Sequence, residues 1–294
     1  MKSQKTLVIL SLLVAILAAV AAGLGVFGQG QGSSFDFISL RGETVSMFGH
    51  GLYKYDTVSG AAQVIAGDII TLVLGIPLLL VSIYFTARGS LRGRLLLTGT
   101  LGYFLYTYMS IAMLLAYNNF FLLYVALFSL SLFAFVAAMM SFDLKTLPGN
   151  FSGKTPRIPV AVFLFVIALF LAMNWIGRII LPALLNGSVP SGLETYATLV
   201  IQAMDLGIIV PAAVLGGVLW LKRSAFGYLL VPVILIKGLT MSAAVTAMSI
   251  NMRAVGAGGL SAADLMFPAI GLIDAVLMFV VLKNVKSDPE QKAI

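Results

Sequence analysis

The sequence predicts an all-α integral membrane protein built as a bundle of eight transmembrane helices. Of the 294 residues, 60% are hydrophobic and 10% are charged, whereas a soluble domain is nearer half apolar and a quarter charged. The mean hydropathy is +1.06. The apolar residues fall into eight segments of about 20 residues, the length that an α-helix needs to cross the hydrocarbon core of a bilayer.

The eight expected spans follow one another with mostly short connections. The first span follows Lys2 and Lys5, and basic residues before an apolar run are also typical of a signal peptide. Its apolar stretch, however, is longer than the hydrophobic region of a signal peptide. We therefore expect it to be retained as a span. The expected spans are residues 7–27, 65–85, 95–117, 120–140, 160–181, 197–221, 228–250 and 262–282.

The distribution of lysine and arginine predicts the orientation. With the N-terminus inside, thirteen of these residues fall in cytoplasmic segments and three, Arg41, Lys54 and Arg253, fall in outer segments. Because cytoplasmic loops carry an excess of lysine and arginine, we expect a cell inner-membrane protein with both termini in the cytoplasm. The same charges favour contact with anionic lipid. No basic run is interleaved with aromatic residues, so we expect no nucleic-acid partner.

One outer connection, residues 28–63, is long and rich in aromatic residues. Near its end, Asp56 and Thr57 are typical of a helix start and predict a short helix leading into span two. Aromatic residues at this density usually lie at the headgroup level or cap a bundle, so we expect the segment to be ordered against the helix ends. The aromatic residues are Phe35, Phe37, Phe48, Tyr53 and Tyr55.

A weak internal repeat divides the chain into two four-helix halves, residues 1–145 and 146–294. Its offset of 134 residues is the separation of Pro77 from Pro211 (211 − 77). Two such halves would be parallel repeats related by an axis along the membrane normal. Leucine matches are frequent by chance in this composition, so chance similarity between the two halves is the alternative. The pairs are Pro77 with Pro211, Ser90 with Ser224, Gly93 with Gly227, Leu95 with Leu229 and Leu96 with Leu230.

Three short stretches carry a likeness to known sequences. They are Gly51-Leu52-Tyr53-Lys54-Tyr55-Asp56, Gly67-Asp68, and Arg88-Gly-Ser-Leu-Arg-Gly-Arg94. On these residues the chain resembles a family of uncharacterised bacterial polytopic membrane proteins, and the likeness covers most of its length. The resemblance implies a multi-pass helical fold. It brings no activity, cofactor or site residue.

Three ionisable residues lie at membrane depth in the second half. Each costs about 2.5–3.5 kcal/mol at the centre of a helix on insertion scales, which makes such residues the best indication of a functional site. At about 1.5 Å per residue, Lys237, Asp274 and Asp205 lie at comparable depths, with Asp274 the closest match to Lys237. We expect Lys237 to lie within reach of one of these acids. Gln202 shares a helix face with Asp205, and Thr240 shares one with Lys237.

Residues near these charges could extend the site. Pro211 and Pro268 are expected to break their helices and free backbone carbonyls toward a cavity. Asn174 and Arg178 stand four apart on span five, where they could reach an anionic ligand. The alternative is that Arg178 extends to the outer interface beside Trp175, an aromatic belt residue.

Two other features have ordinary structural explanations. Asp68 opens span two, where the helix dipole favours a negative charge. Tyr103, Tyr106, Ser110 and Tyr117 form a stripe on span three, which is typical of packing with hydroxyls satisfied across helices. A pocket lining is the alternative for this stripe.

The amino-acid composition narrows the range of possible functions. Cysteine is absent and His50 is the single histidine, which excludes thiolate metal sites, cysteine nucleophiles and haem held by two histidines of one chain. We expect no cofactor or metal, and we disfavour an enzyme. Two functions remain open: a transporter or channel for a small solute or ion, and a non-transporting sensor or accessory subunit of a membrane complex, in which the buried charges form a structural ion pair. A cavity reaching Lys237 would favour transport.

Overall fold

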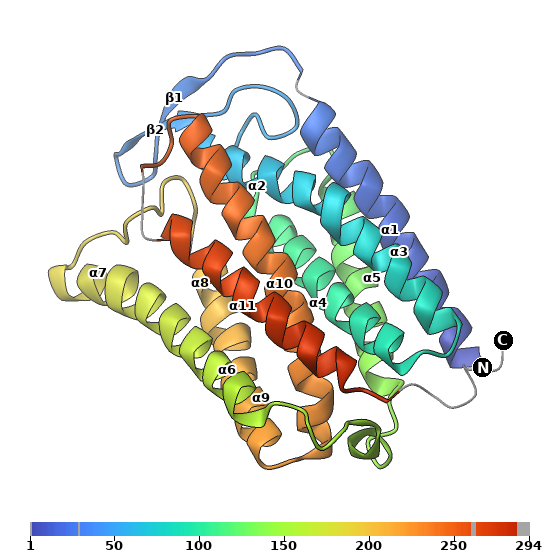
Figure 1. The fold of residues 1–294 in the computed structure, drawn as a ribbon. Coiled ribbons are helices and arrows are strands. Elements are labelled where there is room, and N and C mark those ends of the chain that lie inside the picture. Colours follow the sequence, from blue (N-terminus) through green and yellow to red (C-terminus); the bar gives the residue numbers. More distant parts are fainter. Residues whose placement is uncertain (1, 29, 260–262, 287–294) are drawn as a thin grey trace.

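The protein is described here by a computed structural model that covers residues 2–28, 30–259 and 263–286. In these residues, eight helices are long and apolar enough to cross a membrane. They run beside one another as a single bundle (Figure 1). These candidate spans are Gln4–Phe27, Val58–Ala87, Leu91–Leu114, Phe121–Met140, Arg157–Asn186, Val200–Leu221, Ala225–Ala254 and Asp264–Lys283.

Three candidate spans, the second, fifth and sixth, consist of several helical segments. The α-helices are α1 (Lys2–Phe27), α2 (Val58–Ile70), α3 (Ile76–Ala87), α4 (Leu91–Leu114), α5 (Phe121–Met140), α6 (Arg157–Ala172), α7 (Leu181–Asn186), α8 (Val200–Met204), α9 (Val210–Leu221), α10 (Ala225–Ala254) and α11 (Ala263–Lys283). A short 3-10 helix, η2 (Leu147–Asn150), lies in the loop after α5.

Helix boundaries depart from the expected spans where local capping extends a helix. Span two begins at Val58 because the Thr57 Oγ1 accepts a hydrogen bond from the Gly60 amide at 3.0 Å, which confirms the helix start expected there. Span five continues to Asn186 and ends where Gly187 takes a left-handed φ of 60°. The expected first residue of span eight, 262, lies outside the described residues.

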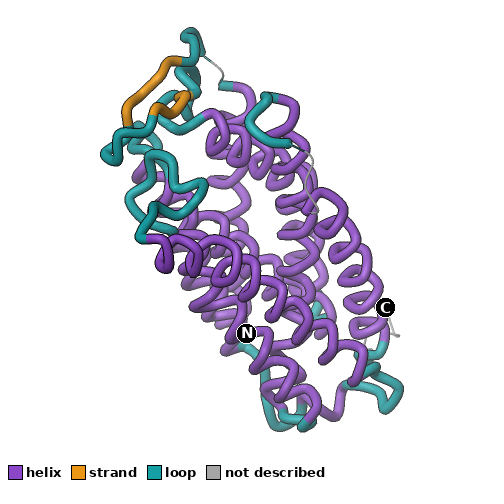
Figure 2. Tube along the Cα trace, turned by 90° about the vertical axis from the view of Figure 1, so that its left-hand side faces the viewer, coloured by secondary structure: helices purple, strands orange, loops and turns teal. Residues whose placement is uncertain are grey.

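The long connection after α1 contains a small β-hairpin that the sequence did not predict. Strand β1 (Phe35–Ile38) pairs antiparallel with β2 (Thr44–Met47). Figure 2 shows the two strands in orange at one end of the bundle, which we call the hairpin end. The opposite end carries the loops rich in lysine and arginine around Arg88–Arg94, Asp143–Arg157 and Lys222–Ser224, and we call it the basic end.

The expected packing of the aromatic outer segment is only partly correct. Tyr53 is 1% exposed and enters the bundle, but Phe35, Phe37 and Tyr55 are 44%, 47% and 54% exposed. The hairpin stands beyond the helix ends (Figure 2), so its aromatic side chains have no helix surface to cover them.

Two clusters of buried apolar side chains form the core, one drawn mainly from each half of the chain, although Ala244 of α10 belongs to the first and Leu95 of α4 to the second. The first joins α1, α3, α4 and α5, with Leu97, Leu101 and Phe104 among its most buried members. The second joins α6, α9 and α10, with Leu164 and Trp220 buried between them. The long helices α4 and α10 pack on each other at the centre of the bundle.

Three candidate spans contain a π-helical segment that ends just before a proline. A proline lacks the backbone N–H, and its ring clashes with the carbonyl four residues earlier. The wider π turn moves that carbonyl out of the way. The segments are η1 (Thr71–Gly75), η3 (Met173–Ile180) and η4 (Asp205–Ile209), and the prolines are Pro77, Pro182 and Pro211.

The break expected at Pro211 is not present, because the helix only widens there into η4 and continues as α9, and the break expected at Pro268 is not present either. Helix α11 continues through Pro268, just as α10 continues through Pro232. A proline alone does not decide whether a helix widens, because the neighbouring helices must also accommodate the released carbonyl.

Element boundaries in the two halves coincide at the offset of 134 residues. The π segments η1 and η4 begin at Thr71 and Asp205, the helices α3 and α9 cover Ile76–Ala87 and Val210–Leu221, and α4 and α10 begin at Leu91 and Ala225.

The turns at the basic end also pack in the same way. A Cβ added to Gly93 would lie 2.5 Å from the Cβ of Phe85, and one added to Gly227 would lie 2.6 Å from the carbonyl carbon of Leu219. Phe85 and Leu219 are themselves 134 residues apart (219 − 85).

Candidate functional site

Asp205 is the centre of a polar cluster between the candidate spans. It is 8% exposed and begins η4. Its Oδ1 accepts a hydrogen bond from the Tyr106 hydroxyl at 2.6 Å, and its Oδ2 accepts one from the Trp175 Nε1 at 2.9 Å. Because Tyr106 lies on α4 and Trp175 in η3, this carboxylate links candidate spans three, five and six.

Lys237 joins the cluster through an aromatic ring. Its ammonium lies 4.0 Å from the centroid of the Tyr106 ring, in a cation–π interaction. Among the residues that the structure describes, neither Asp205 nor Asp274 comes within 4.0 Å of this ammonium. Both negative charges still act on Lys237, that of Asp205 more strongly. Tyr106 therefore mediates the expected association, and no direct salt bridge forms.

Asp274 is the second acid beside Lys237, and it is poorly satisfied. It is 2% exposed on α11, with its Oδ2 packed against the Cα of Gly238 on α10. Its Oδ1 has no hydrogen-bond partner in the described part of the chain. A buried polar atom left without a partner costs about 1–3 kcal/mol, so this carboxyl lowers the stability of the fold. We call Lys237, Tyr106, Asp205, Trp175 and Asp274 the Lys237 cluster.

The other residues expected at this site do not join the cluster. The Thr240 Oγ1 donates to backbone carbonyls of its own helix, at 2.9 Å to Lys237 and 3.2 Å to Ile236. Gln202 is partly buried and makes none of the hydrogen bonds that hold the cluster.

Span five contributes a different residue from those expected. Arg178 is exposed and Asn174 is partly buried, and neither takes part in the hydrogen bonds to Asp205. Trp175 does so instead, because the widened turn of η3 directs its indole toward η4.

Sequence reasoning missed Tyr106 and Trp175 as members of the site, because it assigned them to packing and to an interfacial belt. Each is an aromatic side chain with one polar donor inside an apolar helix. Buried Tyr and Trp donors usually find a partner, so a search for acceptors at the same depth would have pointed to Asp205.

Two π segments meet at the cluster. Trp175 lies inside η3 and Asp205 is the first residue of η4, so the hydrogen bond between them connects two widened turns. At η1, Thr71 shares a hydrogen bond of 2.8 Å with Tyr103 of α4. Single π turns inside α-helices are frequent at functional sites, which favours a functional role for this region of the bundle.

Comparisons with protein-family models, with curated proteins and with solved structures gave no match to this chain. The resemblance to a bacterial membrane-protein family therefore stays a prediction. The geometry of the Lys237 cluster is what bears on function.

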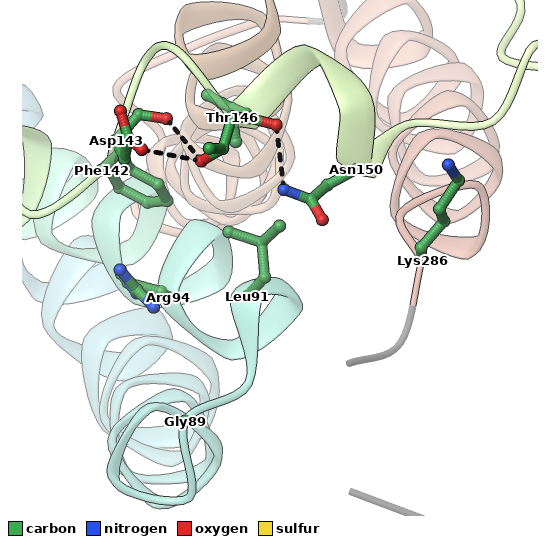
Figure 3. A pocket seen from close by; sticks show the side chains of 9 residues that line it. Gly89, Leu91, Arg94, Phe142, Asp143, Thr146, Asn150 and Lys286 are labelled. Atoms are coloured by element: carbon green, nitrogen blue, oxygen red, sulfur yellow. Dashed lines mark hydrogen bonds between the residues drawn. The ribbon is translucent and has the colours of Figure 1, made fainter. Parts of the chain in front are cut away.

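A cavity of about 250 Å³ at the basic end is a weaker candidate site (Figure 3). It lies between the start of α4 and the loop after α5, near Lys286. Its polar groups are satisfied locally: Thr146 bonds Asp143, Asn150 donates to the Thr146 carbonyl, and Lys286 donates to the Gly149 carbonyl. These bonds explain the cavity as the packing of a loop.

Asp56, at the hairpin end and outside the spans, is a buried acid with a shifted pKa. It is 2% exposed, its Oδ1 accepts from the Ala116 amide at 2.9 Å, and its Oδ2 has no partner among the described residues. Burial raises the pKa of Asp56 to about 6, against the smaller opposing effect of the Ala116 amide.

This shift predicts a pH-dependent stability. Because the pKa of Asp56 is higher in the folded than in the unfolded chain, its contribution is fully present below the unfolded pKa and is lost as the pH rises through about 6. We expect Asp56→Asn, which keeps an acceptor for the Ala116 amide, to be more stable than wild type by up to about 3 kcal/mol at pH 7.5.

Thermal unfolding in detergent measures this difference. The midpoints of Asp56→Asn and wild type should converge near pH 4, and the exposed loop variant Asp143→Asn should follow wild type at both pH values. An Asp56→Asn midpoint at or below wild type at pH 7.5 would show that the buried carboxylate is not destabilising.

Proposed function

We propose that this protein is a proton-coupled transporter of a small solute, with the Lys237 cluster as its binding and coupling site. The observation that carries the proposal is the buried Asp274 carboxyl, whose Oδ1 is unpartnered beside a lysine that has no direct salt bridge among the described residues. In a structural ion pair the ammonium and the carboxylate would contact each other directly, because pairing offsets the cost of burying the two charges. Transport sites leave such charged groups available to exchange a proton or a solute.

The charge of the cluster supports a coupled proton. With both acids ionised, Asp205 and Asp274 outnumber Lys237 by one negative charge, which is unfavourable in an apolar interior. One bound proton removes that excess. We place it on Asp274, because both oxygens of Asp205 already accept hydrogen bonds from Tyr106 and Trp175.

The widened turns of two helices support a solute site at the same place. Secondary transporters commonly bind their substrates near the middle of the membrane, where helices are discontinuous. In this chain, η3 and η4 supply Trp175 and Asp205 to the cluster. A widened turn also leaves backbone groups available to a ligand.

We further propose that the chain is a multi-pass protein of the cell inner membrane, with the basic end in the cytoplasm. The lopsided distribution of lysine and arginine supports this orientation. Within it, the two four-helix halves are parallel repeats. In that arrangement Asp205 and Lys237 of the second half correspond to Thr71 and Tyr103 of the first (205 − 71 and 237 − 103 are both 134). Thr71 and Tyr103 share a direct hydrogen bond, whereas Asp205 and Lys237 are joined through Tyr106.

A flux assay tests the proposed function. The purified protein is reconstituted into liposomes that contain a trapped pH-sensitive dye, and amino acids, small carboxylates and small amines are added one at a time. We expect at least one solute to drive proton entry in wild type. Asp274→Asn should abolish proton entry while keeping solute counterflow, and Lys237→Met should abolish both.

Asp143→Asn, an acid-to-amide change in a loop at the basic end, is the matched control and should transport as wild type does. Proton entry in Asp274→Asn equal to wild type would remove Asp274 from the mechanism. The absence of flux with every solute would favour the second function, a sensor or accessory subunit in which the cluster only joins helices.

A further inference from the structure

A second buried acid lies at the hairpin end, apart from the Lys237 cluster. Asp68 of α2 is 4% exposed, and its Oδ2 accepts a hydrogen bond of 2.5 Å from the Tyr53 hydroxyl. Tyr53 comes from the loop before α2 and is itself 1% exposed. Burial and the charge of Asp68 hold the pKa of the Tyr53 hydroxyl well above its usual range, so Tyr53 remains a donor to this carboxylate.

Two further tyrosine hydroxyls lie near enough to this acid to feel its charge. Tyr108 of α4 and Tyr124 of α5 are 1% and 3% exposed, and neither hydroxyl makes a well-formed hydrogen bond among the described residues, although that of Tyr124 lies within interaction distance of the Tyr53 hydroxyl and the Asn118 side chain. Buried hydroxyls normally find a partner, so two that lack a well-formed hydrogen bond around a single carboxylate are unusual.

Helix α1 is adapted to this group of side chains. A Cβ at Gly25 would collide with the Asp68 carboxylate and lie 2.5 Å from the Tyr53 hydroxyl oxygen. Glycine at this position therefore lets α1 approach the acid and close the site on that side. The site draws on α1, α2, α4, α5 and the loop before α2.

No positive side chain compensates Asp68. Among the residues that the structure describes, no lysine, arginine or histidine lies within salt-bridge distance of it. An isolated carboxylate in an apolar interior is strongly disfavoured. Its compensation must come from a proton or from a bound cation.

We propose that Asp68 and the hydroxyls of Tyr53, Tyr108 and Tyr124 bind a sodium ion. All four groups offer oxygen, the ligand atom that hard cations prefer. A single carboxylate among neutral hydroxyls matches a monovalent charge, whereas calcium sites usually gather several carboxylates. A proton on Asp68 would neutralise its charge but would leave the oxygens of Tyr108 and Tyr124 unsatisfied.

Sodium binding is measured on the purified full-length protein at equilibrium, so the result does not depend on whether the protein transports. Radioactive sodium is titrated by equilibrium dialysis in detergent at pH 7.5, with choline keeping the ionic strength constant. We expect saturable binding of one sodium ion per chain in wild type. Thermal unfolding in sodium chloride and in choline chloride provides a second readout, and sodium should raise the midpoint.

Variants of the site residues distinguish a bound cation from a proton bound to Asp68. Asp68→Asn, which still accepts from Tyr53, should abolish sodium binding. Tyr108→Phe, which removes a hydroxyl that has no partner, should stay folded and weaken the affinity about tenfold, the equivalent of about 1.4 kcal/mol. Asp143→Asn should bind sodium as wild type does.

Three results would overturn the proposal. The first is no saturable sodium binding by wild type, which would leave a protonated Asp68. The second is sodium binding that persists unchanged in Asp68→Asn. The third, which applies if Asp68→Asn does not fold, is an unchanged affinity in both Tyr108→Phe and Tyr124→Phe.

Discussion

Replacing Lys237 with methionine is expected to lower the free energy of unfolding by about 3 kcal/mol, because removing one member of a buried charged group leaves the others uncompensated. The change removes the cation–π contact with Tyr106. It also leaves the charge of Asp205 without compensation, which proton uptake relieves only in part. The exposed loop variant Lys222→Met should keep the wild-type thermal midpoint in detergent.

The two acids should differ in how well their removal rescues Lys237→Met. Asp274→Leu removes a carboxyl with an unpartnered oxygen, so the double variant should regain much of the lost stability. Asp205→Leu would instead leave the Tyr106 hydroxyl and the Trp175 indole without their acceptor, at about 1–3 kcal/mol for each. Equal rescue by both, or a wild-type midpoint for Lys237→Met itself, would contradict the geometry of the cluster.

Alanine at Gly93 and at Gly227 is expected to destabilise the protein to a similar and large extent. The added methyl group would lie 2.8 Å from the carbonyl carbon of Phe85 in one case and 2.6 Å from the carbonyl carbon of Leu219 in the other. Overpacking of this kind typically costs about 1–3 kcal/mol, and backbone atoms cannot move aside as a flexible side chain can.

Gly153→Ala is the control, since a Cβ at that position would meet nothing within 4 Å. Thermal unfolding of the three variants in detergent measures the costs. Two large and similar losses would support equivalent turns in the two halves. A loss at Gly93 without one at Gly227, or losses as small as that of Gly153→Ala, would contradict this.

The sequence predicted the helices well because their signal is local. Eight long apolar runs and the cap at Thr57 required no knowledge of packing. The hairpin was missed because strands β1 and β2 have four residues each, too few for a clear alternating pattern. The π segments depend on whether neighbouring helices accept a displaced carbonyl, and so Pro211 widens its helix while Pro268 does not.

The sequence predicted the membrane depth of the site residues but not the directions in which their side chains point. Rise along a helix placed Lys237, Asp205 and Asp274 at comparable levels. The side chains that touch each other depend on helix rotation and on the π turns, which a single sequence does not specify. Thr240 therefore bonds its own helix, and Trp175 takes the place that one of the two hypotheses gave to Arg178, whose exposure fits the other. At the hairpin end, the helix-dipole explanation of Asp68 was wrong, because α2 begins at Val58 and Asp68 therefore lies ten residues (68 − 58) into the helix, where Tyr53 reaches it from the preceding loop.

Water access to Lys237 tests the transport account most directly. A Cβ at Gly102 of α4 would lie 3.8 Å from the Cβ of Lys237 and 3.4 Å from the Phe135 ring, so a cysteine fits there, and it would be the only thiol in the chain. Val276→Cys is the control, because Val276 lies on the same helix as Asp274 and is 55% exposed on the surface that would face lipid.

The measurement is the rate at which a membrane-impermeant thiol reagent modifies each cysteine in membrane vesicles. If the Lys237 cluster is a transport site, Gly102→Cys reacts much faster than Val276→Cys, although it is the less exposed of the two positions. If both react equally slowly, the bundle is dry around Lys237, and the cluster is a structural link between helices.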